Sequence, residues 1–137
     1  MPRERQRILS IALIAALAWV APPLREVTAA DWAKARLVTV VTVEYRFLPE
    51  HLVFRAGVAY RLHVVNRGHE LHELTAPEFF KTVALRNPEA LNREHTELVL
   101  QPGEQKDLYF VTKRRGRYDM RCADHDWAGM TGDITVK

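Results

Sequence analysis

Apolar and polar residues alternate along most of the chain after residue 36, a pattern typical of β-strands that bury one face. Turn residues, each group containing a glycine, interrupt the alternation at 55–57, 101–104 and 114–116. Short strands separated in this way predict an all-β fold, a β-sandwich of about seven to eight strands. The predicted strands are residues 37–45, 52–54, 59–66, 97–100, 106–112, 117–122 and 132–136.

The alternation fails between residues 77 and 92. Residues 79–85 lie in this part of the chain and are expected to form either a short helix or a packed loop. The chain contains no internal repeat, low-complexity tract or internal linker. We therefore expect a single folded domain.

The first 30 residues follow the pattern of a secretory signal peptide. Three arginines stand within residues 3–7, an uncharged apolar run fills residues 8–21, and small residues end the segment after a proline pair. We predict cleavage near residue 30, which leaves a domain of residues 31–137 that is periplasmic or otherwise exported. The alternative is an uncleaved membrane anchor, although the apolar run is shorter than the ~20 residues that span a bilayer.

The positive charge of the chain lies mainly in this leader. Of the 20 basic and 17 acidic residues, the leader holds four and two, so residues 31–137 carry a net charge of +1. This balance gives no support for nucleic-acid binding. The chain has one cysteine, so an internal disulfide is impossible. In an oxidising compartment such a cysteine is intermolecular, buried and inert, or a metal ligand.

Cys122 is followed by His125 and Met130, which places a thiol, an imidazole and a thioether within nine residues. These are the ligand types of a copper electron-transfer centre. Alternation in the strand 117–122 points Cys122 into the sandwich, at the end of a core strand. Because His125 and Met130 lie in the loop that follows, we expect the three side chains to converge on one point.

A second histidine would complete such a site, and His72 is the best candidate. It follows the strand 59–66 through a short turn, and Leu71 and Leu74 beside it suggest a partly buried position. His69 is its closest competitor. We expect the remaining histidines to serve in packing or at the surface: His51, His63 and His95.

The chain resembles the cupredoxins, the small type 1 blue copper proteins, over nearly the whole of residues 31–137. The motifs that carry the resemblance are Phe47-x-Pro49, Leu52-x-Phe54-x2-Gly57, the run 60–66 that leads to His72, Pro102-Gly103-Glu104, and Tyr118-x3-Cys122-x2-His125-x4-Met130-x-Gly132. The Cys-to-Met spacing is similar to that of plastocyanin and pseudoazurin. The resemblance implies a Greek-key sandwich that binds one copper ion, with three equatorial ligands and one axial ligand: His72, Cys122 and His125, and Met130.

One position departs from the family pattern. Many cupredoxins have asparagine directly after the first histidine ligand, where this chain has Glu73. A carboxylate there would either accept a hydrogen bond that holds the loop or place negative charge close to the metal. Zinc is the main alternative to copper, but zinc sites favour additional cysteines or histidines and rarely recruit methionine.

We expect the protein to be a one-electron carrier that exchanges electrons with redox partner proteins and acts as a monomer. His125, at the surface end of the site, is the expected electron port. Trp127 belongs either to an apolar docking patch beside it or to a cap on the core, and Asp124 and Asp126 would form an acidic rim that steers a basic partner. The alternative function is copper sequestration, delivery or resistance. An enzyme is not expected, because the sequence shows no nucleophile with its base, phosphate loop or paired-carboxylate site.

The basic turn of residues 113–117 precedes the strand that ends at Cys122. It should therefore lie at the end of the sandwich opposite the metal. It is either a solvated hairpin tip or a second contact site, for a partner or for anionic lipid.

Overall fold

A computed structural model describes residues 30–137 of this protein. The predicted signal peptide, and the anchor that is its alternative, therefore lie outside the described residues except for Ala30. Within the described part, no helix is long and apolar enough to cross a membrane.

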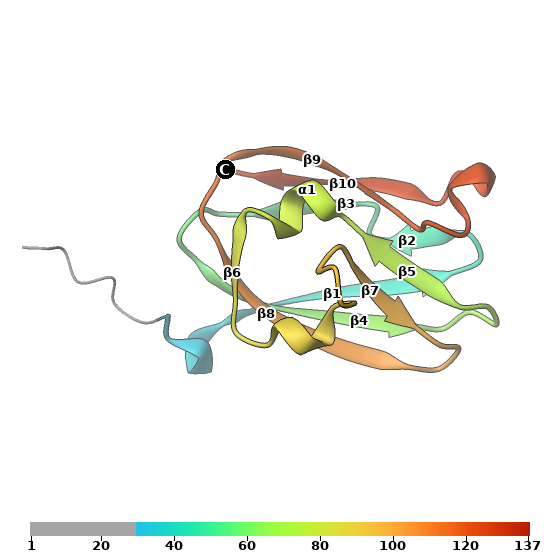
Figure 1. The fold of residues 1–137 in the computed structure, drawn as a ribbon, viewed down its shortest axis with the longest axis horizontal. Helices are drawn as coiled ribbons and strands as arrows, with labels where there is room; N and C mark the ends of the chain where they lie inside the picture. Colours follow the sequence, from blue (N-terminus) through green and yellow to red (C-terminus); the bar gives the residue numbers. More distant parts are fainter. Residues whose placement is uncertain (1–29) are drawn as a thin grey trace, which may run out of the picture.

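Ten strands form two five-stranded sheets that pack face to face (Figure 1). The first sheet has the order β2-β1-β4-β8-β6, and the second has the order β3-β10-β9-β5-β7. The strands of the first sheet are β1 (Arg36–Val43), β2 (Arg46–Leu48), β4 (Ala59–Asn66), β6 (Val83–Leu85) and β8 (Gln105–Thr112). Those of the second are β3 (His51–Phe54), β5 (His72–Thr75), β7 (Glu97–Leu100), β9 (Gly116–Arg121) and β10 (Thr131–Val136).

Little of the described chain is helical. One short helix, α1 (Pro77–Phe80), follows β5 and begins with a proline, which suits the first turn because it has no N–H to leave unpaired. Single 3₁₀ turns lie at Trp32–Lys34, Pro88–Ala90 and Asp126–Ala128.

The core between the sheets is built on aromatic rings. Phe54, Phe79 and Phe110 are fully buried and lie with ring centroids 5.1 to 5.7 Å apart, two pairs edge to face and one stacked. Leucines from both sheets fill the space around them, among them Leu52, Leu62, Leu74, Leu98 and Leu108. Burial of each such side chain contributes about 2 kcal/mol to the stability of the fold. The two packed sheets therefore fix the ends of the loops that join their strands.

The predicted β-sandwich is confirmed, and each of the seven predicted strands is present within two residues of its expected bounds. Three short strands were not predicted: β2, β5 and β6. β5 is buried along most of its length and β6 is half-buried throughout, so neither alternates, and β2 has only three residues. Residues 79–85 divide between the end of α1 and β6, with Lys81 and Thr82 between them.

The strand register places two loops at one end of the sandwich. β9 and β10 pair antiparallel with Arg121 opposite Thr131, so residues 122–130 form the loop between them. β5 joins the same edge, with Thr75 opposite Arg121, so the beginning of β5 lies beside this loop. We call this end, with the segments 67–71 and 122–130, the site pole; it lies on the right in Figure 1.

The opposite pole holds the turn between β8 and β9 and the end of β10. Gly116 pairs with Val136 there, the full length of the hairpin away from Thr131. Lys113, Arg114 and Arg115 are exposed in this turn. The predicted position of the basic turn, at the end away from Cys122, is therefore confirmed.

Candidate metal centre

His72, Cys122 and His125 come together at the site pole. Their ligand atoms all lie within 4.8 Å of one another, and all three side chains are buried. His72 opens β5, Cys122 directly follows β9, and His125 stands in the loop between β9 and β10. Two neighbouring strands of one sheet and the loop beyond them thus bring one cysteine sulfur and two imidazoles together.

His72 is the most informative member of this group. Its ring is fully buried, yet neither Nδ1 nor Nε2 has a hydrogen-bond partner among the described residues. The nearest carboxylate oxygen, Glu44 Oε1, is 3.5 Å from Nε2, which is too long for a good hydrogen bond. Burial lowers the pKa of His72, so the ring is held neutral with a lone pair to donate. A buried imidazole with no partner is costly unless a metal ion satisfies it.

The Cys122 sulfur lies close to both histidines. Sγ is 3.4 Å from His125 Nδ1, and the backbone N–H of Glu73 donates to Sγ over 3.3 Å. Burial raises the pKa of the Cys122 thiol, and the N–H of Glu73 opposes that effect. The proton must leave before the sulfur can bind a metal, and the N–H of Glu73 then stabilises the thiolate.

His125 is 8% exposed and is the member of the group nearest to solvent. Its Nδ1 faces Cys122, and its Nε2 lies 2.7 Å from Glu70 Oε2. The Tyr45 ring packs against its outer side at a centroid distance of 4.8 Å. The sequence placed Glu70 near the site, two residues before His72, but did not indicate its contact with His125. Tyr45 was not identified, because it reaches the site from a loop far away along the chain.

Met130, the fourth residue predicted at the site, is fully buried at the end of the same loop. Its carbonyl accepts the N–H of Cys122 over 3.0 Å, and its own N–H donates to the carbonyl of His125 over 3.3 Å. Gly129 before it has a φ of 81°, a left-handed conformation that glycine adopts without strain. These backbone contacts fold residues 122–130 into a compact loop.

Two polar side chains fix the loop that carries His72. The buried amide of Asn66 donates to the carbonyls of Glu70 and Leu100, and its oxygen accepts the N–H of Gly68. Glu73 accepts the N–H of Asp124 over 3.1 Å and so joins this loop to the cysteine loop. Of the two roles expected for the carboxylate at position 73, the structure therefore shows the loop-holding one. Burial raises the pKa of Glu73.

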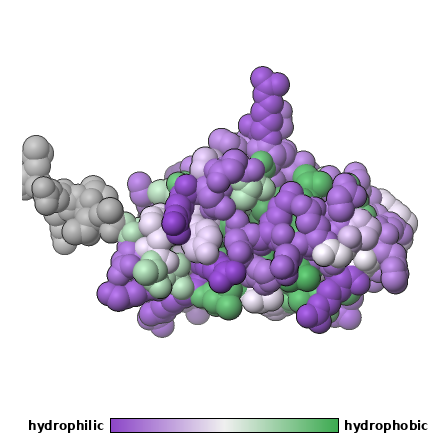
Figure 2. Space-filling view, turned by 90° about the horizontal axis from the view of Figure 1, so that it is seen from below, coloured by the Kyte–Doolittle hydropathy of each residue, from purple (hydrophilic) through white to green (hydrophobic). Residues whose placement is uncertain are grey.

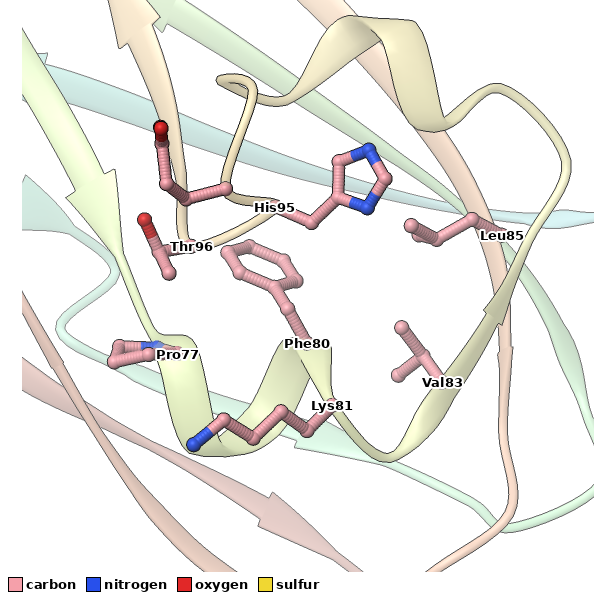
Figure 3. A pocket seen from close by; sticks show the side chains of 8 residues that line it. Pro77, Phe80, Lys81, Val83, Leu85, His95 and Thr96 are labelled. Carbon is pink, nitrogen blue, oxygen red and sulfur yellow. The ribbon is translucent and has the colours of Figure 1, made fainter.

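The other histidines lie away from the group. His69 is exposed, and only its backbone N–H is engaged, with Glu44. His51 pairs with Asp133, and His63 pairs with Asp107. His95 lines a surface hollow of about 360 Å³ beside α1, together with the apolar side chains of Phe80, Val83 and Leu85 (Figure 3). The choice of His72 over these residues agrees with the geometry.

Trp127 does not cap the core. Its side chain is 76% exposed, and its indole N–H donates to the backbone carbonyl of Asp124 over 2.9 Å. It lies in the short 3₁₀ turn Asp126–Ala128, which has no buried residue. The expectation of a core cap is therefore wrong, and Trp127 presents an aromatic surface beside His125.

A family model described as a cupredoxin-like domain matches residues 9–136. Auracyanin B is similar in structure with a TM-score of 0.56 and 23% identity, over 75% of this chain and 89% of that one. An auracyanin from the photosynthetic bacterium Roseiflexus castenholzii has a TM-score of 0.56 and 14% identity, over 80% and 99%. A multicopper oxidase from Campylobacter jejuni has a TM-score of 0.55 and 16% identity, over 74% of this chain and 30% of that one. No curated protein sequence matches the chain.

Proposed function

The chain belongs to the cupredoxin-like domain family, and on that premise we propose that it binds one copper ion and carries single electrons between redox proteins. The proposed ligands are His72, Cys122, His125 and Met130. The observation that carries the proposal is the His72 ring, buried beside a cysteine sulfur with neither nitrogen hydrogen-bonded among the described residues. Copper bound there would supply a one-electron couple, Cu(I)/Cu(II), that this set of soft and imidazole ligands suits.

The protein would contribute a ligand set that is largely preassembled, because His72, Cys122 and His125 already lie within reach of one another. His72 and Cys122 are attached to neighbouring strands of one sheet, and backbone hydrogen bonds close the loop that holds His125 and Met130. Because the ligands are fixed by strands and by hydrogen bonds, they need little movement when the charge at the site changes. A rigid site of this kind favours fast electron transfer.

The exchange surface would lie at the site pole. His125 is the proposed ligand closest to solvent, and Trp127 projects beside it. Asp124 and Asp126 are exposed on the same loop. An exposed aromatic side chain with acidic neighbours suits a redox partner whose docking face is basic.

We propose a carrier rather than an enzyme, because four protein ligands would leave no position for a substrate at the metal. Sequestration or delivery of copper is the second candidate function, since any protein that binds copper can store it. The burial of all the proposed ligands favours the carrier, because a delivery site must expose its metal to an acceptor.

Redox cycling of the copper-loaded protein tests this proposal. A carrier should show a reversible one-electron couple and keep its copper and its spectrum through repeated reduction and reoxidation. The control is the same protein held reduced with a Cu(I) chelator. Rapid transfer of copper to the chelator, with an irreversible couple, would contradict the carrier function and support copper handling.

A further inference from the structure

We propose that Glu70, supported by Tyr45, is a positioning residue that sets the orientation and tautomer of the His125 ring. The inference deepens the proposed function and rests on it, since it concerns the imidazole that would bind copper. It assigns a role to two side chains outside the predicted ligand set.

The two nitrogens of His125 face different partners. Nδ1 lies 3.4 Å from Cys122 Sγ, on the side where the metal would bind, and Nε2 lies 2.7 Å from Glu70 Oε2. An ionised carboxylate can only accept hydrogen bonds, so Nε2 must carry the proton. The lone pair of a neutral ring is then on Nδ1, the nitrogen that faces the Cys122 sulfur.

Tyr45 holds the carboxylate in place. Its hydroxyl donates to the other carboxylate oxygen, Glu70 Oε1, over 3.1 Å. Its ring lies against the His125 ring at 4.8 Å and against Trp127 at 5.8 Å. The hydroxyl therefore fixes Glu70 while the ring limits rotation of the imidazole.

The contact joins three loops of the site pole. Tyr45 lies between β1 and β2, Glu70 lies between β4 and β5, and His125 lies between β9 and β10. β1, β2 and β4 belong to the first sheet, whereas β5, β9 and β10 belong to the second. The Tyr45–Glu70–His125 chain thus spans the end of the sandwich and covers the outer nitrogen of the proposed ligand.

A surface ion pair is the simpler explanation of the Glu70 contact, and the two explanations make different predictions. The Glu70 side chain is 47% exposed, so the pair itself adds little to folding stability. A partner on the second nitrogen of a ligating imidazole nonetheless selects the tautomer and makes the ring a stronger electron donor. Stronger donation favours Cu(II), so loss of the carboxylate should raise the reduction potential.

The first test is ¹⁵N NMR of the histidine rings in the metal-free protein. Wild type should show His125 as a single tautomer with the proton on Nε2, and Glu70→Ala should show a mixture of tautomers. Glu70→Gln should keep the wild-type tautomer, because its amide oxygen still accepts the N–H. Asp126→Asn is the matched control, since it removes one negative charge from the same pole and its carboxylate lies 3.9 Å from Arg121 rather than against His125.

The second readout is the reduction potential of the copper-loaded variants. Glu70→Ala should raise it more than Asp126→Asn does, with Tyr45→Phe between them. An unchanged tautomer in Glu70→Ala, or a potential equal to that of the Asp126→Asn control, overturns the inference. The NMR measurement needs no copper, so it tests the role of Glu70 independently of the proposed function. A wild type that forms no thiolate–copper chromophore would contradict the proposed function without changing the tautomer result.

Discussion

At the scale of single residues, the site depends on side chains that bind no metal. Asn66 is fully buried, and its amide uses two donors and one acceptor to hold the segment between β4 and β5. Because His72 follows this segment directly, the side chain of Asn66 determines where the first proposed ligand stands. An asparagine at the end of a strand is common, and only its fully paired, buried state reveals this role.

Replacing Asn66 with alanine should lower the free energy of unfolding by about 3 kcal/mol, because buried backbone groups lose their partners. The variant should also release copper faster than wild type. Urea unfolding and a chelator competition measure the two effects. Asn92→Ala is the control, since Asn92 bonds to Thr96 and Glu97 in another loop and should lower stability without changing copper release. Equal copper release by the two variants would contradict the role given to Asn66.

Met130 should influence the reduction potential of the copper more than the affinity for it. In the proposed role of weak axial ligand it would contribute little to affinity, but it would influence the balance between the two oxidation states. Met130→Leu should therefore retain copper, keep the thiolate colour and change the reduction potential. Voltammetry and metal analysis on the same sample check this. Loss of all copper from the variant would show that the axial role is wrong.

At the scale of elements, every described strand of six or more residues was predictable, and three of the five shorter ones were not. β4 spans eight residues with every second side chain buried, so its alternation alone identifies it. β5 has four residues, three of them buried, and is defined by pairing with β7 rather than by its own pattern. The approach of His72 to Cys122 follows from the pairing of β5 with β9, while the contact between Glu70 and His125 follows from loop geometry that no local pattern encodes.

The pairing of β4 with β8 includes an ion pair whose effect depends on pH. Arg61 donates two hydrogen bonds to the Asp107 carboxylate, and His63 lies 2.8 Å from it. The hydrogen bonds from Arg61 are the main cause that lowers the pKa of Asp107. A carboxylate with a lowered pKa stabilises the fold above its unfolded pKa, near 3.8, and this stabilisation is lost as the pH falls through the folded pKa.

Asp107→Asn should therefore be less stable than wild type at neutral pH, by roughly 1 kcal/mol because the pair is partly solvated. The difference should shrink as the pH falls below the ordinary aspartate range. Urea unfolding at a series of pH values measures it, with the exposed Asp119→Asn as the control. A difference that stays constant down to the lowest pH would show that lost packing, not charge, causes it.

At the scale of the whole molecule, charge is distributed unequally between the two poles. The site pole carries exposed acids on two loops, and the opposite pole carries Lys113, Arg114 and Arg115, with Arg55 and Lys137 beside Arg115. The face seen in Figure 2 is mostly hydrophilic, with apolar residues in separate patches. This charge distribution would orient a basic redox partner toward the end that holds the proposed copper ligands.

Neutralising both acids of the cysteine loop, as Asp124→Asn with Asp126→Asn, should slow electron exchange with a cationic metal complex. The effect should weaken as salt is added, because exposed charges are screened. Stopped-flow rates at several ionic strengths measure it, and an anionic complex should show the opposite change. Replacing Lys113, Arg114 and Arg115 with glutamine is the control, because they lie at the far pole and should leave the copper spectrum unchanged. Equal rate changes in both variants would contradict steering by the site pole.

Above all, Cys122, His72 and His125 are proposed to bind copper as a type 1 centre. The most direct test is the visible absorption and electron paramagnetic resonance spectrum of the protein after addition of one equivalent of Cu(II), with Cys122→Ser as the control. We predict an intense thiolate-to-copper charge-transfer band that bleaches on reduction and is absent from the serine variant. A pale wild-type product, or a variant that keeps the band, would contradict the claim.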